Sequence, residues 1–189
     1  NEAFDVSTSL PDALEKTIDC MLDFAAFSLM EIWLVSPNKQ QIYLVARNNR
    51  TPELQQFYSE TQAVKSFTKG RGLPGWVWQK KMLHTWLQLN DIQEFNRIEA
   101  ARKAGIKSVI VTPLTSKGEV VGVMVLGFTR NDEPMNLITP LVSGFSEHLG
   151  AEIKRKQLEQ ELNQIFKAAP DILCIAGLDG YFKKFNPAM

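Results

Sequence analysis

The sequence has little of what builds covalent or metal-held structures. It contains two cysteines, Cys20 and Cys174, which lie far apart and each in an apolar context. We therefore expect two buried free thiols rather than a disulfide. The two histidines, His84 and His148, are equally scattered, so the spacing of residues indicates no metal site.

Long hydrophobic runs and an excess of one charge are also missing. No apolar stretch approaches the roughly 20 residues that cross a bilayer, and the polar, acidic start is no signal peptide. Lys plus Arg and Asp plus Glu number 21 each, so the formal net charge is zero. This balance gives no electrostatic drive toward nucleic acid or an anionic membrane. We expect a cytoplasmic chain with no nucleic-acid partner and no membrane contact.

A recognisable catalytic set is missing as well. The sequence shows no Ser/His/Asp set, no P-loop and no close carboxylate pair with supporting groups. His148 lies in EHLGAEI, which lacks the sequence context of a kinase phosphoacceptor histidine. We predict that this chain is not itself an enzyme.

What the sequence does contain is an ordered series of helix and strand patterns. Helical spacing or composition covers about 11–24, 53–61 and 97–104, and strand-like runs cover 27–35, 41–47, 109–114 and 120–128. Short turns at 36–39 and 116–119 join strands into hairpins. These patterns predict an α+β fold, with an antiparallel sheet flanked by helices.

The least generic stretch is GRGLPGWVWQKKMLHTW, at 70–86. Its glycines and Pro74 predict one particular loop path. Glycine can adopt backbone angles that other residues cannot, and proline fixes its own φ angle. Pro74 also removes an amide donor, and no Lys-Ser/Thr follows, so this stretch does not cradle phosphate. Its tryptophans form either a local core or the wall of a pocket.

A long helical pattern begins near Pro134. Apolar residues step by four from Leu137 to Ile153, and the charged run KRKQLEQELNQ then carries Leu158, Leu162 and Ile165 at heptad-like spacing. Such a helix usually finds a partner helix, so we predict a homodimer. The alternative is a solvated helix that frays. The residues predicted to face the second copy are Leu141, Phe145, Leu149, Ile153, Leu158 and Leu162.

The order of these elements and several sequence segments resemble a GAF domain. The matching segments are AFSLMEIWLV at 26–35, GLPGWVWQKK at 72–81, AARKAGIKSVIVTPL at 100–114 and GEVVGVMVLGF at 118–128. The resemblance covers roughly residues 10–153. It implies a GAF-like antiparallel sheet flanked by helices and a regulatory rather than catalytic role.

The tail FKAAPDILCIAGLDGYFKKFNPAM, at 166–189, is similar to the first strands of a PAS domain. We therefore predict a GAF-like sensor domain over 1–153, a helical, coiled-coil-like linker over 154–169 and an incomplete PAS domain start over 170–189. Because the chain also lacks an initiator Met, we expect it to be part of a longer protein. The combination resembles the sensory half of a bacterial sensor histidine kinase, with a diguanylate cyclase or phosphodiesterase as the next choice of output.

The resemblance also bears on ligands, since GAF domains bind cyclic nucleotides, bilins, haem or small metabolites. Neither cysteine lies in the pocket region, which disfavours a covalent bilin. FTRNDE at 128–133 matches half of the cyclic-nucleotide pattern, but the Asn-Lys pair expected at the preceding strand end is missing, which disfavours a cyclic nucleotide. The cofactor or ligand is therefore unknown.

Two functional hypotheses remain. In the first, the chain senses a small molecule and relays the change through the linker helix to PAS and output domains. The candidate pocket residues are Phe67, Trp76, Trp78, His84 and Trp86, with Arg47 and Arg71 as polar anchors. In the second, the rings fill the pocket themselves, and the domain is a ligand-free dimerisation and relay module.

Overall fold

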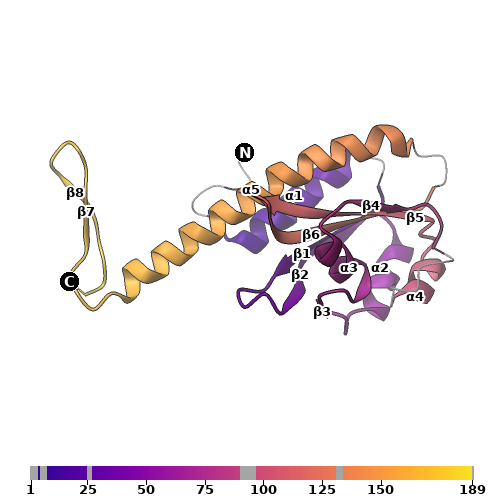
Figure 1. The fold of residues 1–189 in the computed structure, drawn as a ribbon, viewed down its shortest axis with the longest axis horizontal. Helices are drawn as coiled ribbons and strands as arrows, with labels where there is room; N and C mark the ends of the chain where they lie inside the picture. Colours follow the sequence, from indigo (N-terminus) through magenta and orange to yellow (C-terminus); the bar gives the residue numbers. More distant parts are fainter. Residues whose placement is uncertain (1–3, 5–7, 25–26, 90–96, 131–133, 189) are drawn as a thin grey trace. The chain divides into compact units, whose positions relative to one another are not determined.

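The computed structural model describes residues 4, 8–24, 27–89, 97–130 and 134–188 (Figure 1). Its helices are α1 (Leu10–Phe24), α2 (Pro52–Glu60), α3 (Gly72–Lys80), α4 (Ile98–Lys103) and α5 (Met135–Ala168). Its strands are β1 (Leu29–Val35), β2 (Gln41–Asn49), β3 (Ser66–Thr68), β4 (His84–Trp86), β5 (Ser108–Ser116), β6 (Glu119–Phe128), β7 (Cys174–Ala176) and β8 (Phe182–Phe185). The chain divides into two compact units, Asn1–Glu152 and Ile153–Met189.

The first unit is built on an antiparallel sheet, which confirms the predicted α+β fold. Its described strands follow the order β3-β2-β1-β6-β5-β4. Strand β1 lies between β2 and β6, and both of its faces are apolar except at Glu31, as in a central strand. The β5–β6 hairpin turns through Lys117 and Gly118, at φ 49° and 79°, in the left-handed region that such tight turns require.

Helices cover both faces of this sheet. Helix α1 contacts β1 and β2, and the first part of α5 lies on the same side as α1, whereas α2, α3 and α4 lie on the other side (Figure 1). Because side chains alternate along a strand, Met30, Ile32 and Leu34 of β1 face α1 and α5, and Glu31 and Trp33 face α2 to α4. We call these the α1/α5 face and the α2–α4 face.

Helix α1 forms where the sequence predicted it, but its cysteine is not in the core. The Ser9 hydroxyl accepts a hydrogen bond from the Asp12 amide at 3.3 Å, as an N-cap does. Leu14 and Ile18 are fully buried, and Cys20, two residues further round the helix, points away from them and is exposed. Cys174 is also exposed. Both thiols are free, but the prediction that they are buried is wrong.

The glycine-rich stretch also differs from the prediction of a loop, because α3 already begins at Gly72. Pro74 is tolerated there, since the first-turn amide it lacks would have had no partner within the helix. A Cβ on Gly75 would lie 2.4 Å from the Thr68 carbonyl oxygen, so this glycine allows α3 to approach β3. The stretch thus specifies close packing of a helix as well as a turn.

Helix α5 has 34 residues, and the apolar residues predicted to form one stripe along it are partly buried and partly exposed. Leu149 and Ile153 are buried and Phe145 is half-buried, but Leu141, Leu158 and Leu162 are 74%, 52% and 68% exposed. The reason is geometric: each four-residue step drifts by about 40° around a helix with 3.6 residues per turn, so a run of such steps leaves the buried side. The buried side within the first unit instead follows Val142, Ser146, Leu149 and Gly150.

The second unit holds the end of α5 and the β7–β8 hairpin. The Asn186 amide joins these two parts: its Oδ1 accepts from the Leu173 amide at 2.9 Å, and its Nδ2 donates to the Ala169 and Asp171 carbonyls at 3.1 and 2.9 Å. Lys184 adds a hydrogen bond to Asn163 Oδ1 at 3.0 Å. Both hairpin strands are otherwise exposed.

Candidate functional site

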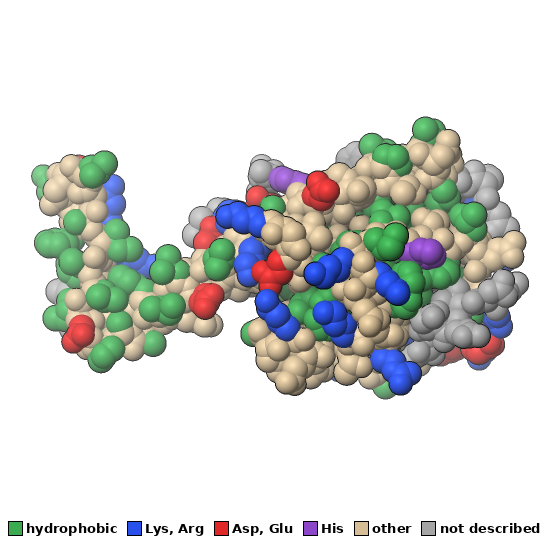
Figure 2. Space-filling view, viewed as in Figure 1, with side chains coloured by type: hydrophobic (Ala, Val, Ile, Leu, Met, Phe, Trp, Pro, Cys, Tyr) green, Lys and Arg blue, Asp and Glu red, His purple; other side chains and the backbone are tan. Residues whose placement is uncertain are grey.

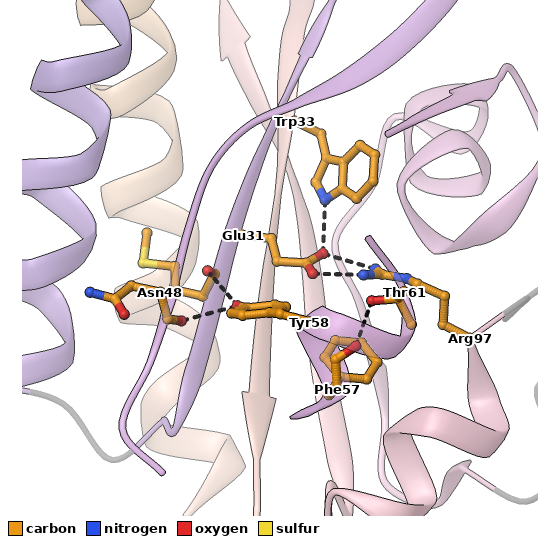
Figure 3. A network of polar contacts seen from close by, with 8 residues as sticks. Glu31, Trp33, Asn48, Phe57, Tyr58, Thr61 and Arg97 are labelled. Atoms are coloured by element: carbon orange, nitrogen blue, oxygen red, sulfur yellow. Dashed lines mark hydrogen bonds and ion pairs between the residues drawn. The ribbon is translucent and has the colours of Figure 1, made fainter. Parts of the chain in front are cut away.

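A buried ion pair lies at the centre of the α2–α4 face. The Arg97 guanidinium binds the Glu31 carboxylate with two hydrogen bonds, Nη1 to Oε1 at 2.7 Å and Nη2 to Oε2 at 2.8 Å (Figure 3). The Trp33 indole N–H donates to the same Glu31 Oε2 at 2.9 Å. Glu31 is 0% exposed and Arg97 4%, so this bidentate pair is shielded from water.

The fold brings these groups together from three places in the chain. Glu31 and Trp33 are two residues apart on β1 and therefore share a face. Arg97 precedes α4, and its guanidinium carbon lies 5.5 Å from the Trp33 ring centre and 5.1 Å from that of Phe57. Arg47 is directly opposite Glu31 in the β1–β2 register, which adds a second cation beside the carboxylate.

Tyr58 of α2 extends the network along the sheet. Its hydroxyl lies within hydrogen-bonding distance of the Met30 and Asn48 carbonyls, at 3.3 and 3.1 Å, and these two residues are cross-strand partners. The Arg47 guanidinium carbon lies 4.3 Å from the centre of the Tyr58 ring, in cation–π geometry. Tyr58 thus attaches helix α2 to β1 and β2 next to the Glu31–Arg97 ion pair (Figure 3).

The electrostatics keep the pair ionised. Burial alone would raise the pKa of Glu31, but the charge of Arg97, the hydrogen bonds from Arg97 and Trp33 and the charge of Arg47 leave this pKa below its ordinary value. Burial would likewise lower the pKa of Arg97, and Glu31 raises it above the usual range. Burial and the nearby Glu31 charge raise the pKa of Tyr58. A carboxylate held in this way is a weak base, so the network is suited to hold charge and position rather than to transfer protons.

The sequence-predicted pocket residues fall into two groups. Phe67 and Trp78 belong to the buried core of this face, and Phe67 packs on Trp33 with 5.1 Å between ring centres. Trp76, His84 and Trp86 form a half-buried cluster in which the ring centres are 4.4 to 5.5 Å apart and the rings meet edge to face.

The two predicted polar anchors lie apart from this half-buried cluster. Arg47 stacks on Tyr58, and Arg71 is exposed at the N-terminus of α3. That these side chains bind a ligand stays a prediction. Residues 131–133 of the FTRNDE segment lie outside the described residues.

Sequence reasoning missed the ion pair itself. Glu31 gave a signal, because it is the only charged residue in an otherwise apolar strand. A buried acid needs a partner, but its partner is 66 positions away and reads as an ordinary helix start. Among the residues that the structure describes, no group of three His, Cys, Asp or Glu side chains is placed to hold a metal ion. No described helix has the length and apolarity of a membrane span.

Comparison with protein families identifies the class of this fold. A model of the GAF domain matches residues 7–150. The chain therefore belongs to the GAF domain family, whose members are generally sensory and regulatory modules of signalling proteins. This confirms the resemblance in the first domain. The PAS-like start in the tail stays a prediction, and comparison with curated proteins finds no match.

Solved structures support the same fold. The GAF domain of an Acinetobacter phosphoenolpyruvate-protein phosphotransferase is 18% identical, with a TM-score of 0.65 over 85% of this chain and 91% of that one. A domain of a Sinorhizobium meliloti putative two-component sensor histidine kinase is 17% identical, with a TM-score of 0.61 over 84% and 99%. The free methionine-R-sulfoxide reductase of Neisseria meningitidis, solved with its substrate, is 15% identical, with a TM-score of 0.60 over 86% of each chain. At these identities the likeness shows the fold alone.

Proposed function

We propose that this chain is the regulatory module of a bacterial signal-transduction protein, such as a sensor histidine kinase, and that it relays its state through α5. The observation that carries this proposal is the close packing of α5 on the sheet. A Cβ on Gly150 would lie 2.3 Å from the Thr115 carbonyl oxygen, and the Thr112 hydroxyl lies 3.2 Å from that of Ser146. Because α5 continues without interruption to Ala168, a shift of the sheet changes the position of a long helix.

The signal in this proposal is a small molecule bound on the α2–α4 face. The aromatic cluster of Trp76, His84 and Trp86 supplies flat apolar surface, whereas Arg47 on Tyr58 and Arg71 at the start of α3 supply positive charge apart from this cluster. Binding shifts the module between two states only if the ligand prefers one of them. Output by a diguanylate cyclase or phosphodiesterase is the alternative to a kinase.

A second candidate, ligand-free relay, is favoured by the burial on this face. Trp33, Phe57, Tyr58, Phe67 and Trp78 are each 7% exposed or less, and the Glu31 carboxylate already accepts three hydrogen bonds from the protein. In this reading the rings and the ion pair complete the core, and the module only pairs and transmits.

Native mass spectrometry of the purified chain tests both readings, because it reports bound small molecules and oligomeric state together. A bound metabolite, or a thermal shift with one member of a metabolite and nucleotide panel, supports sensing. If no small molecule is bound and no panel member shifts the melting temperature, the result supports ligand-free relay. Turnover of any panel member would contradict the proposal that the chain is not an enzyme.

We also propose that the chain forms a homodimer through α5. Leu137, Leu141, Leu158, Leu162 and Ile165 are 52% to 74% exposed and fit one heptad series along the helix. Sedimentation of the wild type is expected to show a dimer, and Leu158→Glu with Leu162→Glu is expected to give a monomer. The matched control is Gln160→Glu with Gln164→Glu, which adds the same charge on the opposite side and leaves the dimer. A wild-type monomer would contradict the proposal.

Residues 170–189 begin a PAS domain in this proposal. The β7–β8 hairpin and its attachment to the end of α5 by Asn186 support it, since this contact couples the helix end to the next sheet. Asn186→Ala is expected to speed amide exchange in β7 and β8 while leaving β1 and β6 unchanged. Unchanged exchange in the hairpin would argue against the coupling.

A further inference from the structure

The segment from residue 61 to residue 89 has an unusual charge pattern in a chain of zero net charge. It contains no Asp or Glu, and its cations are Lys65, Lys69, Arg71, Lys80 and Lys81. The same segment carries three of the four tryptophans. It builds β3 and β4, which are the two outer strands of the described sheet, and α3, which contacts β2, β3, β5 and β6.

Among the described residues these cations have no acidic partner, a property they share with the exposed Lys16, Lys107 and Lys117 but not with several other cations of the domain. Lys39 pairs with Glu119 at 2.7 Å and Lys103 with Glu60 at 4.0 Å. Within the described part of the chain, no cation between residues 61 and 89 forms a salt bridge. The ammonium groups of Lys69 and Lys80 instead lie over the Trp78 and Trp76 rings, at 5.3 and 5.8 Å from their centres.

Strand β4, which follows Lys80 and Lys81 in the chain, forms an edge of the described sheet. It is the last strand in the described sheet and pairs only with β5. Met82 and Leu87 flank it and are 55% and 64% exposed. Figure 2 shows Lys and Arg side chains gathered around exposed hydrophobic ones on the face in view. An unpaired edge offers backbone N–H and C=O groups to another chain, and exposed apolar side chains beside it favour association.

We propose that the surface formed by Lys80, Lys81, Trp76, Trp86 and the edge of β4 binds an acidic, extended segment of a partner protein as an added strand. The backbone of the segment pairs with β4, its Asp and Glu side chains meet the lysines, and its apolar side chains pack on Trp86, Met82 and Leu87. The inference goes beyond the proposed function and does not depend on a bound small molecule.

A polypeptide fits this surface better than a nucleic acid does. Only a polypeptide completes the hydrogen bonds of a strand edge. The rings of Trp76, His84 and Trp86 meet edge to face at 60° to 68°, so they present no parallel faces between which bases could stack. The zero net charge of the chain also gives no general attraction to phosphate.

A displayed library of short random peptides, selected on the full chain, tests the proposal. Selected sequences are expected to be enriched in Asp and Glu next to aromatic or aliphatic residues. A selected peptide synthesised with alternate N-methylated amides is expected to bind at least about tenfold more weakly, because the methyl groups remove strand hydrogen bonds. Its binding should also shift the backbone amide signals of residues 84–86.

The variant Lys80→Gln with Lys81→Gln is expected to weaken binding of the same peptide by about tenfold and to keep the fold, since both side chains are exposed. The control, Lys16→Gln with Lys107→Gln, removes the same charge from other exposed sites and should bind as the wild type does. Library selection without acidic enrichment, or equal binding by both variants, overturns the proposal. Binding to single-stranded DNA or to phosphatidylserine vesicles in place of the peptide overturns it as well.

Discussion

The two faces of the sheet are built from the same strands and yet bury different kinds of side chain. On the α1/α5 face, β1 contributes Met30, Ile32 and Leu34, all fully buried and apolar. On the α2–α4 face it contributes Glu31, which binds Arg97, and Trp33, which donates a hydrogen bond to Glu31. The first face therefore depends on shape and close approach, and the second on charge balance. Substitutions on the two faces should therefore change the stability of the protein in different ways.

The largest effect is expected from breaking the ion pair on one side only. Arg97→Ala leaves Glu31 as an uncompensated buried charge, which should lower the free energy of unfolding by about 3–5 kcal/mol in urea titrations. Arg102→Ala is the matched control, because it breaks an exposed pair with Glu99 and should change stability by about 0–1 kcal/mol. Similar losses in the two variants would show that the α2–α4 face does not depend on charge balance.

Replacing both partners sharpens the same point. In Glu31→Gln with Arg97→Met, no charge is buried, and the Gln side-chain oxygen can still accept from the Trp33 indole. A buried ion pair can often be replaced by uncharged groups at little cost, so this double variant should be clearly more stable than Arg97→Ala. A double variant as unstable as the single one would assign the loss to packing of Arg97 on Trp33 and Phe57 instead.

On the α1/α5 face, added volume rather than lost charge should be damaging. The Cβ in Gly150→Ala would lie 2.3 to 2.8 Å from three backbone atoms of Thr115, so α5 must move and about 1–3 kcal/mol of stability should be lost. Gly144→Ala in the same helix has no atom within 4 Å and should stabilise by up to about 1 kcal/mol, because alanine favours helix. Thermal unfolding of both variants measures the difference, and equal melting temperatures would contradict the close approach.

Lowering the pH should destabilise the α2–α4 face through Glu31 without changing the volume of any side chain. Because the pKa of Glu31 is lower in the folded than in the unfolded protein, its stabilising contribution is present above its unfolded pKa, near about 4.3, and is lost as the pH falls through the folded value. The stability of the wild type should therefore decrease more steeply below about pH 4 than that of Glu31→Gln with Arg97→Met. Urea titrations from neutral to acidic pH measure this, and parallel curves would show that the carboxylate is not held ionised by its partners.

The contrast also explains how far the sequence could predict this structure. The four long strands β1, β2, β5 and β6, their hairpins and α1 follow local rules, such as the short turn at Lys117 and the cap at Ser9, and were predicted close to their observed bounds. The bounds of the short edge strands β3 and β4 were not predicted. The ion pair could not be predicted, because the pattern of residues along the chain does not show that Glu31 and Arg97 meet in the folded protein. The exposure of Leu141 was also missed, because a stripe of four-residue steps gradually turns away from the buried side of a helix.

The smallest expected effect concerns a single hydroxyl on the α1/α5 face. Ser108 is 3% exposed, and its Oγ has no hydrogen-bond partner in the described part of the chain. Ser108→Ala removes a desolvated polar group and should raise the free energy of unfolding by up to about 1 kcal/mol. Ser146→Ala is the matched control: its hydroxyl donates to the Ser143 carbonyl at 2.8 Å and lies 3.2 Å from the Thr112 hydroxyl, so its removal should lower stability by about 1 kcal/mol. If urea titrations show equal losses in the two variants, the Ser108 hydroxyl is bonded in solution, and this face relies on polar contacts as much as on shape.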